Sequence, residues 1–443
     1  MLHLSAHYTY PRLLAFTLPS MGMMLAISLY TVVDGFFVAN FVGKDALAAI
    51  TILFPLLGIL GSVGFMFGTG GAALVGKLLG QGQTRCANAT FSLLFGISLG
   101  SGIVLSLLGE WLLVPLLTWF GAQGAILTES LCYGRIALLS LPGLILQFFF
   151  QPFFVTAEKP SLGFWVTIAA GCTNIVLDAL LLCGLEMGVA GAAIATAASE
   201  YIGGFLPLCF FAKPHTDTLC LQKPLLALAP IGKAALNGCA EFCINVCFPL
   251  QMVIYNQQLL QLAGEDGVAA YGVLLYVAYV FLAILLGYAV GSAPLISYNF
   301  GAKNMKELRN IFDKSLVFNL CAGLFLTLFL ALLAAPIARL FTGYDPTLCR
   351  LTQRAILFLS PLFVFASLNI YGASFFTAMN NGILAATISC LRTLVFGVLP
   401  VFVLPLFWGL DGVWLAWSSG EILTLAITIP LLGRIRTNTT KTP

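Results

Sequence analysis

The sequence predicts an all-α integral membrane protein with twelve transmembrane helices arranged as two repeats of six. Three observations support this prediction: the composition, the number of long apolar segments, and an internal repeat of 221 residues. Of the 443 residues, 60% are hydrophobic and 8% are charged, and the mean hydropathy is +1.00. Because a soluble domain carries about 25% charged residues, this composition indicates a chain that lies mostly within a membrane.

The apolar segments give the number of spans. A helix needs roughly 20 mostly apolar residues to cross a hydrocarbon core about 30 Å thick. Breaks at charged or Gly/Pro-rich points divide the chain into twelve such segments. We expect them at 12–41, 46–76, 86–114, 129–157, 161–184, 188–212, 229–262, 268–299, 309–338, 351–378, 383–407 and 410–433.

The longest segment between spans falls near the middle of the chain. It is "KPHTDTLCLQKPLLAL" at 213–228, and it contains two lysines, a histidine and an aspartate. This composition is typical of a linker between two halves. We therefore predict an N-terminal lobe at 1–212, a cytoplasmic linker at 213–228 and a C-terminal lobe at 229–443.

The basic residues orient the chain, because cytoplasmic loops of membrane proteins are enriched in Lys and Arg. With a cytoplasmic N-terminus, fourteen basic residues lie on the inner side and five on the outer side. The inner set is Arg12, Lys77, Arg85, Lys159, Lys213, Lys223, Lys233, Lys303, Lys306, Arg309, Lys314, Arg434, Arg436 and Lys441. The outer set is Lys44, Arg135, Arg339, Arg350 and Arg354. We expect both termini in the cytoplasm, and the start "MLHLSAHYTYPR" has no pattern of a cleaved signal peptide.

The repeat supports the division into halves. "VGKDALAAI" at 42–50 recurs as "AGEDGVAAY" at 263–271, an offset of 221 residues. The same offset pairs Gly70 with Gly291, Gly80 with Gly301, Pro115 with Pro336, Thr156 with Thr377, Gly188 with Gly409 and Glu200 with Glu421. Six spans per half is an even number, so both halves enter the membrane from the same side, as in transporters with parallel repeats. Two such bundles enclose a central cleft, which favours a carrier.

Several stretches resemble the multidrug and toxic compound extrusion (MATE) family. They are "VDGFFVANFVGKDALAAI" (33–50), "GTGGAALVGKLLGQG" (68–82), "CTNIVLDALLLCGLEMGVAGAAIAT" (172–196) and "GSAPLISYNFGAKN" (291–304). "NGCAEF" (237–242) is similar to the start of the seventh helix in the subgroup of small bacterial drug exporters. The resemblance implies a two-lobed, V-shaped transporter that expels organic cations in exchange for another cation.

Five carboxylates fall inside predicted spans: Asp34, Asp178, Glu200, Glu241 and Glu421. A charged side chain at the bilayer centre costs at least about 2.5–3.5 kcal/mol, so we expect these residues to face the bundle interior or a wet cavity.

Asp34 and Asp178 are the candidate coupling residues. Both lie roughly 12–14 Å below the outer surface, counted at about 1.5 Å per residue. Two carboxyl groups that share a low-dielectric environment favour a bound proton. In proton-driven members of the family, residues of the first and fifth helices have this role, and Asp34 and Asp178 match those positions. The alternative is a neutral Asp that fixes helix packing, with Asn174 or Thr31 as its partner.

The repeat separates these carboxylates from the others. The counterparts of Asp34 and Asp178 at the 221-residue offset are Tyr255 and Leu399, so neither carboxylate is needed to build a six-helix lobe. Glu200 and Glu421 are each other's counterparts, which favours a role in shared architecture.

Further polar residues complete the candidate substrate or ion site. Glu241 is a candidate to meet a cation in the C-terminal lobe, and Arg392, the one basic residue well inside a span, is expected to form a salt bridge or line the cleft. Aromatic faces bind large organic cations, and two matched segments, "LQFFFQPFFVTAEKP" (146–160) and "ASLNIYGASFFTAMNNG" (366–382), are rich in phenylalanine. The remaining candidates are Glu200, Gln147, Gln151, Asn174, Tyr255, Asn369 and Tyr371.

These observations predict a multidrug efflux antiporter that exports cationic amphiphilic molecules in exchange for protons by alternating access. We expect a monomer in the bacterial inner (plasma) membrane, with no enzymatic activity, no nucleic-acid partner, no cofactor and no metal. Cys239, Cys243 and Cys247 are interpreted as packing residues. The alternatives are a sodium-coupled drug antiporter and a lipid-linked oligosaccharide flippase, although a flippase would need several basic residues inside the spans to hold pyrophosphate.

Overall fold

The computed structural model describes residues 3–119, 121–213, 219–224 and 227–439, and all regular structure in these ranges is helical. The first bundle consists of α1 (Tyr10–Phe37), α2 (Lys44–Gly80), α3 (Thr84–Trp119), α4 (Gly124–Thr156), α5 (Pro160–Asp178), α6 (Gly188–Phe205) and the short α7 (Leu208–Phe211). Two π-helical segments, η1 (Val38–Val42) and η2 (Ala179–Gly184), continue α1 and α5.

The second bundle repeats this plan. It consists of α8 (Leu228–Gly301), α9 (Met305–Thr342), α10 (Pro346–Leu359), α11 (Leu362–Ala378), α12 (Gly382–Cys390), η3 (Leu391–Val395), α13 (Phe396–Val403), α14 (Pro405–Trp408) and α15 (Leu410–Thr439). Segment η3 is again π-helical and joins α12 to α13.

The described helices account for the twelve predicted crossings. By length and composition, ten of them are able to cross a membrane, and the pair α10 and α11, bent by 45°, adds an eleventh. Helix α8 has 74 residues, far more than one crossing needs, and it is broken at Gly264. There φ is +64°, a left-handed conformation that glycine adopts without a steric penalty. Counting α8 as two spans gives twelve.

Local signals fix several of the helix boundaries. Asp345 caps α10 by accepting hydrogen bonds from the backbone N–H groups of Thr347 and Leu348, and Pro346 occupies the first turn, where its missing N–H costs nothing. Asn304 caps α9 in the same way. The 45° bend between α10 and α11 falls at Pro361, and proline is a common cause of a sharp kink because it lacks the backbone N–H.

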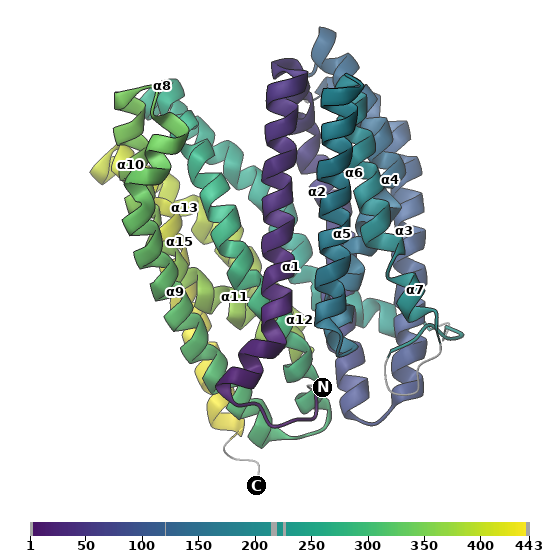
Figure 1. Cartoon of the computed structure of the whole chain (residues 1–443). Coiled ribbons are helices and arrows are strands. Elements are labelled where there is room, and N and C mark those ends of the chain that lie inside the picture. The colour runs from purple at the N-terminus through teal and green to yellow at the C-terminus, as the bar shows by residue number, and fades with distance from the viewer. Residues whose placement is uncertain (1–2, 120, 214–218, 225–226, 440–443) are drawn as a thin grey trace.

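The two bundles form a V. Figure 1 shows α1 to α7 on one side and α9 to α15 on the other, close together at the end that carries both chain termini and diverging toward the opposite end. We call the first the closed end. The exact boundaries of the predicted lobes and linker stay a prediction, because residues 214–218 and 225–226 lie outside the described ranges.

The lobes meet in a contact that follows the sequence repeat. A Cβ atom at Gly80 of α2 would overlap the carbonyl oxygen of Tyr298 in α8, and one at Gly301 would overlap the carbonyl oxygen of Lys77. Positions 80 and 301, and likewise 77 and 298, differ by 221 residues. The two contacts are therefore equivalent, as expected for two repeats related by a pseudo-twofold axis.

Residues 3–9, which we call the N-terminal strap, connect the lobes at the closed end. The backbone N–H of Leu4 donates to Glu158 in the α4–α5 turn at 2.6 Å, and that of Tyr8 donates to Glu307 of α9 at 2.8 Å. His3 and His7 contact the same two carboxylates. The side chains of Leu4 and Tyr8 are buried.

Candidate functional site

The pair predicted for coupling lies together between α1 and α5. Asp34 is near the end of α1, shortly before η1, and Asp178 is the last residue of α5, directly before η2. The two carboxyl groups adjoin each other, and Asn174, one helical turn before Asp178, adjoins Asp34. Segments of π-helix occur often at functional sites, and here each carboxylate sits beside one.

These polar groups have few partners. Asp178 is fully buried and Asn174 is 2% exposed. Both carboxylate oxygens of Asp178, Oδ1 of Asp34 and Oδ1 of Asn174 are buried, and no hydrogen bond reaches them from the described residues. Thr31, the other proposed packing partner, donates instead to the Ile27 carbonyl oxygen of its own helix. An unpaired buried carboxylate is costly, so the geometry suits a proton or a small cation held between the two groups.

A third carboxylate, Glu200 of α6, belongs to the same lobe. The hydroxyl of Ser140 donates to Glu200 Oε2 at 2.6 Å. Tyr133 of α4, which is 5% exposed, lies near Asp34, Glu200 and Asp178. None of the salt bridges formed by the described residues includes any of these three carboxylates. The lobe thus holds one buried acid, Asp178, and two partly buried acids, Asp34 and Glu200, and none of the three has a basic partner among the described residues.

Sequence reasoning did not identify Tyr133, Ser140 or Thr196 as neighbours of this cluster. The hydroxyl of Thr196 in α6 is also buried without a partner among the described residues. All three are single polar residues in apolar spans, and only the packing of α4 and α6 against the pair shows their place.

In the C-terminal lobe, the counterpart of Glu200 is neutralised. Arg392 Nη2 and Nε both lie 2.7 Å from Glu421 Oε1, and Asn369 Nδ2 donates to Glu421 Oε2 at 2.8 Å. Arg392 belongs to η3, and at the 221-residue offset its counterpart is Gly171. The salt bridge, one of the two expectations for Arg392, is present, and no salt bridge of the described residues includes the equivalent Glu200.

Tyr255, the counterpart of Asp34, is a packed core residue. Its side chain is 2% exposed and stacks on Tyr271, with 5.4 Å between ring centroids. The C-terminal lobe therefore has an aromatic pair where the N-terminal lobe has its first acidic residue.

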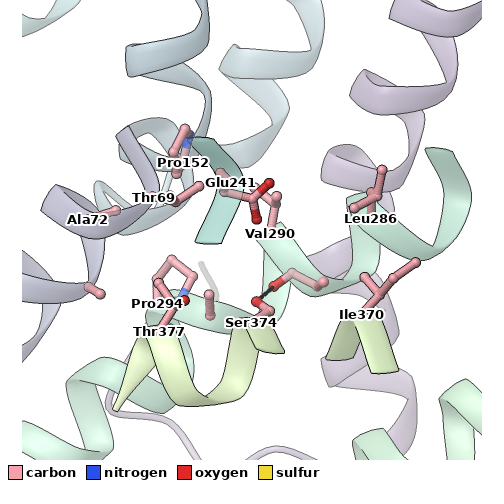
Figure 2. A pocket seen from close by; sticks show the side chains of 13 residues that line it. Thr69, Ala72, Pro152, Glu241, Leu286, Val290, Pro294, Ile370, Ser374 and Thr377 are labelled. Atoms are coloured by element: carbon pink, nitrogen blue, oxygen red, sulfur yellow. Dashed lines mark hydrogen bonds between the residues drawn. The ribbon is translucent and has the colours of Figure 1, made fainter. Parts of the chain in front are cut away.

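Glu241 lines a small pocket between the lobes. The pocket has a volume of about 40 Å³ and is bounded by α2, α4, both halves of α8, and α11. Figure 2 shows the Glu241 carboxylate at this pocket, near Val290, and Thr69 and Ser374 also line the pocket. A volume of this size holds a few water molecules, so in this conformation the pocket is too small for a drug-sized molecule.

The two phenylalanine-rich segments, 146–160 and 366–382, line this pocket, but not through the four residues that we predicted. Gln147, Gln151, Asn369 and Tyr371 are all at most 4% exposed and lie inside their lobes. Gln147 donates to the hydroxyl of Tyr30 at 3.3 Å, and Asn369 binds Glu421. The pocket is lined instead by Pro152, Ile370, Ser374 and Thr377 of the same two segments. A substrate contact by the four predicted residues would require a different conformation and stays a prediction.

The cysteines of α8 are close to each other. Cys239 Sγ and Cys243 Sγ lie 3.8 Å apart. Within the described ranges, no group of three or more His, Cys, Asp or Glu side chains has an arrangement that suits a metal ion.

Comparison with known proteins gives consistent results. The MatE family model matches residues 19–180 and 239–403, well over half of the chain. Among curated proteins, the multidrug export protein MepA of Staphylococcus haemolyticus (strain JCSC1435) is 27% identical over 290 residues, which cover 64% of this chain and 63% of that protein. MepA of Staphylococcus aureus (strain MSSA476) is 27% identical over 303 residues, which cover 66% and 65% of the two chains. The matching part thus spans just under two thirds of these relatives.

Solved structures show the same fold. An outward-facing MATE-family transporter of the MOP superfamily superposes with a TM-score of 0.92 at 20% identity, covering 99% of this chain and 98% of the other. A mutant of the Vibrio cholerae MATE transporter VcmN gives a TM-score of 0.89 at 20% identity, with 97% of each chain covered. From the family match and the shared fold, we conclude that this chain belongs to the MATE family.

Proposed function

We propose that this protein is a multidrug efflux antiporter that exports organic cations in exchange for protons. The observation that carries this proposal is the cluster of Asp34, Asp178 and Glu200, three buried or partly buried carboxylates of one lobe without a basic partner among the described residues. Such a cluster favours binding of protons or a small cation over a permanently charged state. The relatives named as multidrug export proteins support the export of drugs.

The difference between the lobes supports coupling in the N-terminal lobe. Arg392 already balances the charge of Glu421, so binding of a proton or another cation to Glu421 is less favourable. Among the described residues, Asp34 and Asp178 form no salt bridge with a basic side chain. Protonation of this pair removes a repulsion between α1 and α5, and we infer that the resulting change in packing weakens the binding of the exported cation.

We place the protein in the bacterial plasma membrane as a monomer, with both termini in the cytoplasm. This orientation rests on the excess of Lys and Arg at the closed end. The diverging ends of the lobes then face outward, and alternating access requires the closed end to open. Glu241, at the pocket between the lobes, is the proposed contact for the cationic substrate as it crosses.

Sodium is the alternative coupling ion, because the unpartnered oxygens of Asp34, Asp178, Asn174 and Thr196 are all ligands that a hard cation accepts. A flippase for lipid-linked sugars fits less well. Arg392 is paired with Glu421 inside its lobe, so it does not offer the basic site that a pyrophosphate needs.

The test is efflux of a fluorescent organic cation from proteoliposomes that contain the purified protein. A proton gradient and a sodium gradient of equal size are imposed in separate experiments. We expect proton-driven efflux in the wild type and a fall to the level of empty liposomes in Asp34→Asn and Asp178→Asn, because the amides cannot carry the proton. Folding is checked by gel filtration.

Asp266→Asn is the matched control, since Asp266 is exposed beside the break of α8 at Gly264, in the other lobe. It should transport like the wild type. Efflux that only the sodium gradient drives would mean that sodium, and not the proton, is the coupling ion. An absence of organic-cation efflux under both gradients would contradict cation antiport.

A further inference from the structure

A second and larger pocket lies at the closed end of the V. Its volume is about 580 Å³. Lys77 of α2 lines it from the N-terminal lobe, while Asn380, Asn381 and Arg434 line it from the C-terminal lobe. The remaining lining residues are apolar, and none of the described lining residues is acidic. The pocket therefore combines two positive charges with amide groups at the seam between the lobes.

The surrounding contacts hold the polar residues in place. Lys77 Nζ lies over the ring of Phe300, 5.4 Å from its centroid. Asn380 bridges the lobes, since its Nδ2 donates to the Ala73 carbonyl oxygen at 3.1 Å and its Oδ1 accepts from Asn237 at 2.9 Å. Asn381 caps α12 by accepting from the backbone N–H of Leu384. The positive end of the α12 dipole thus adds to the charges of Lys77 and Arg434.

The sequence repeat shows what fills the equivalent place in the other lobe. At the 221-residue offset, Phe376 and Met379 of this pocket correspond to Val155 and Glu158. The N-terminal strap lies on those two residues: Leu4 packs in the cluster that includes Val155, and its backbone N–H donates to Glu158. In one repeat the backbone N–H of the strap thus donates to Glu158. The other repeat has Met379 at this position, and no residue of the strap is among the described residues that line its pocket.

We propose that this pocket binds a phosphate group, either the headgroup of an anionic phospholipid or free inorganic phosphate. Lys and Arg side chains with an amide and a helix N-terminus are the groups that recognise phosphate in proteins. Basic pockets on the cytoplasmic side of membrane proteins bind anionic headgroups. Because Lys77 and Arg434 belong to different lobes, a bound phosphate bridges them and stabilises the closed end. This site is separate from the acidic cluster, so the proposal does not depend on the coupling ion.

Two binding measurements on the full-length protein test the proposal. Native mass spectrometry of the protein released from micelles counts retained phosphatidylglycerol against phosphatidylcholine. A melting experiment in detergent compares inorganic phosphate with chloride at equal ionic strength. We expect retention of phosphatidylglycerol, a higher melting temperature in phosphate, or both. The double variant Lys77→Gln/Arg434→Gln should weaken binding on the order of tenfold or more, since each basic residue near an anionic surface contributes measurably.

The control is Lys213→Gln/Lys303→Gln, which removes the same charge from the predicted cytoplasmic face. Lys213 is the counterpart of Arg434, and neither lysine lines the pocket. If the double variant does not fold, the single variant Arg434→Gln takes its place, because Arg434 is exposed and its substitution should leave folding intact. Binding of phosphatidylglycerol alone assigns the site to a lipid, and stabilisation by inorganic phosphate alone assigns it to the free ion. Equal binding by the wild type and both pocket variants, or no binding of either probe, overturns the proposal.

Discussion

The equivalent glutamates of the two lobes, Glu200 and Glu421, have different surroundings, and single residues cause this difference. Glu421 has a guanidinium and an amide around it, whereas Glu200 has one serine hydroxyl. The side chains of Arg392 and Glu421 are 15% and 3% exposed. Removing one member of so enclosed a pair leaves a buried charge without compensation.

We therefore expect Arg392→Gln to destabilise the protein by about 3–5 kcal/mol, the cost of breaking a buried ion pair. The control is Arg354→Gln. Arg354 also pairs with an acid of the same lobe, Asp411, but these side chains are 62% and 28% exposed, and a surface pair contributes about 0–1 kcal/mol. Melting temperatures of the purified variants in one detergent provide the comparison. Equal small shifts in both would show that the Arg392 pair is hydrated.

The candidate residues could be predicted from the sequence to different degrees. The proximity of Asp34 and Asp178 followed from their depth, because the rise per residue of a helix fixes where each side chain lies along the span. The partner of Arg392 did not follow, since Glu200, Glu241 and Glu421 all lie in spans and only helix packing selects one. For the same reason, Gln151 and Asn369 were expected at the cleft although they face the interiors of their lobes.

At the scale of elements, the twelve spans were predicted to within a few residues because each needs a long apolar run and few charges interrupt them. The break inside α8 was expected at "AGEDG", residues 263–267, between two predicted spans, and the structure has it at Gly264. The π-helical segments were not predicted. A π turn inserts one residue and so rotates the helical face that follows, but spans that are apolar on most sides have no clear helical period in which this shift could be read for η1, η2 or η3.

The crossing of α2 and α8 depends on glycine at two equivalent positions. We expect Gly80→Ala and Gly301→Ala each to destabilise the protein by about 1–3 kcal/mol, because the added methyl group would overlap a backbone carbonyl that cannot move alone. Thermal unfolding in detergent measures this loss.

Gly96→Ala in α3 is the matched control, since a Cβ there meets nothing within 4 Å. That variant should be neutral or gain up to about 1 kcal/mol from helix propensity. Similar losses at all three glycines would mean that α2 and α8 can separate to accept a methyl group.

At the scale of the whole molecule, the closed end is held by more than helix packing. The N-terminal strap bonds to Glu158 of one lobe and to Glu307 of the other, and Lys314 Nζ and Asn310 Nδ2 donate to the Tyr8 carbonyl oxygen at 2.6 and 2.9 Å. This link was not predicted, since residues 3–9 have no periodic pattern. Separation of the lobes at this end must break the strap from at least one of its anchors.

Glu307→Gln should therefore favour opening of the closed end. A hydrogen bond to a charged group contributes about 1.5–3 kcal/mol, so loss of the charge that receives both Tyr8 N–H and His7 shifts the equilibrium by roughly 10- to 100-fold. Hydrogen–deuterium exchange followed by mass spectrometry detects this as faster exchange in peptides that contain residues 77–81 and 298–302, where α2 and α8 cross. Glu265→Gln, at an exposed residue beside the break of α8 at Gly264, removes the same charge and should leave these peptides unchanged. If exchange rises in residues 3–9 alone, the strap is a local contact, and the crossing of α2 and α8 by itself keeps the lobes together.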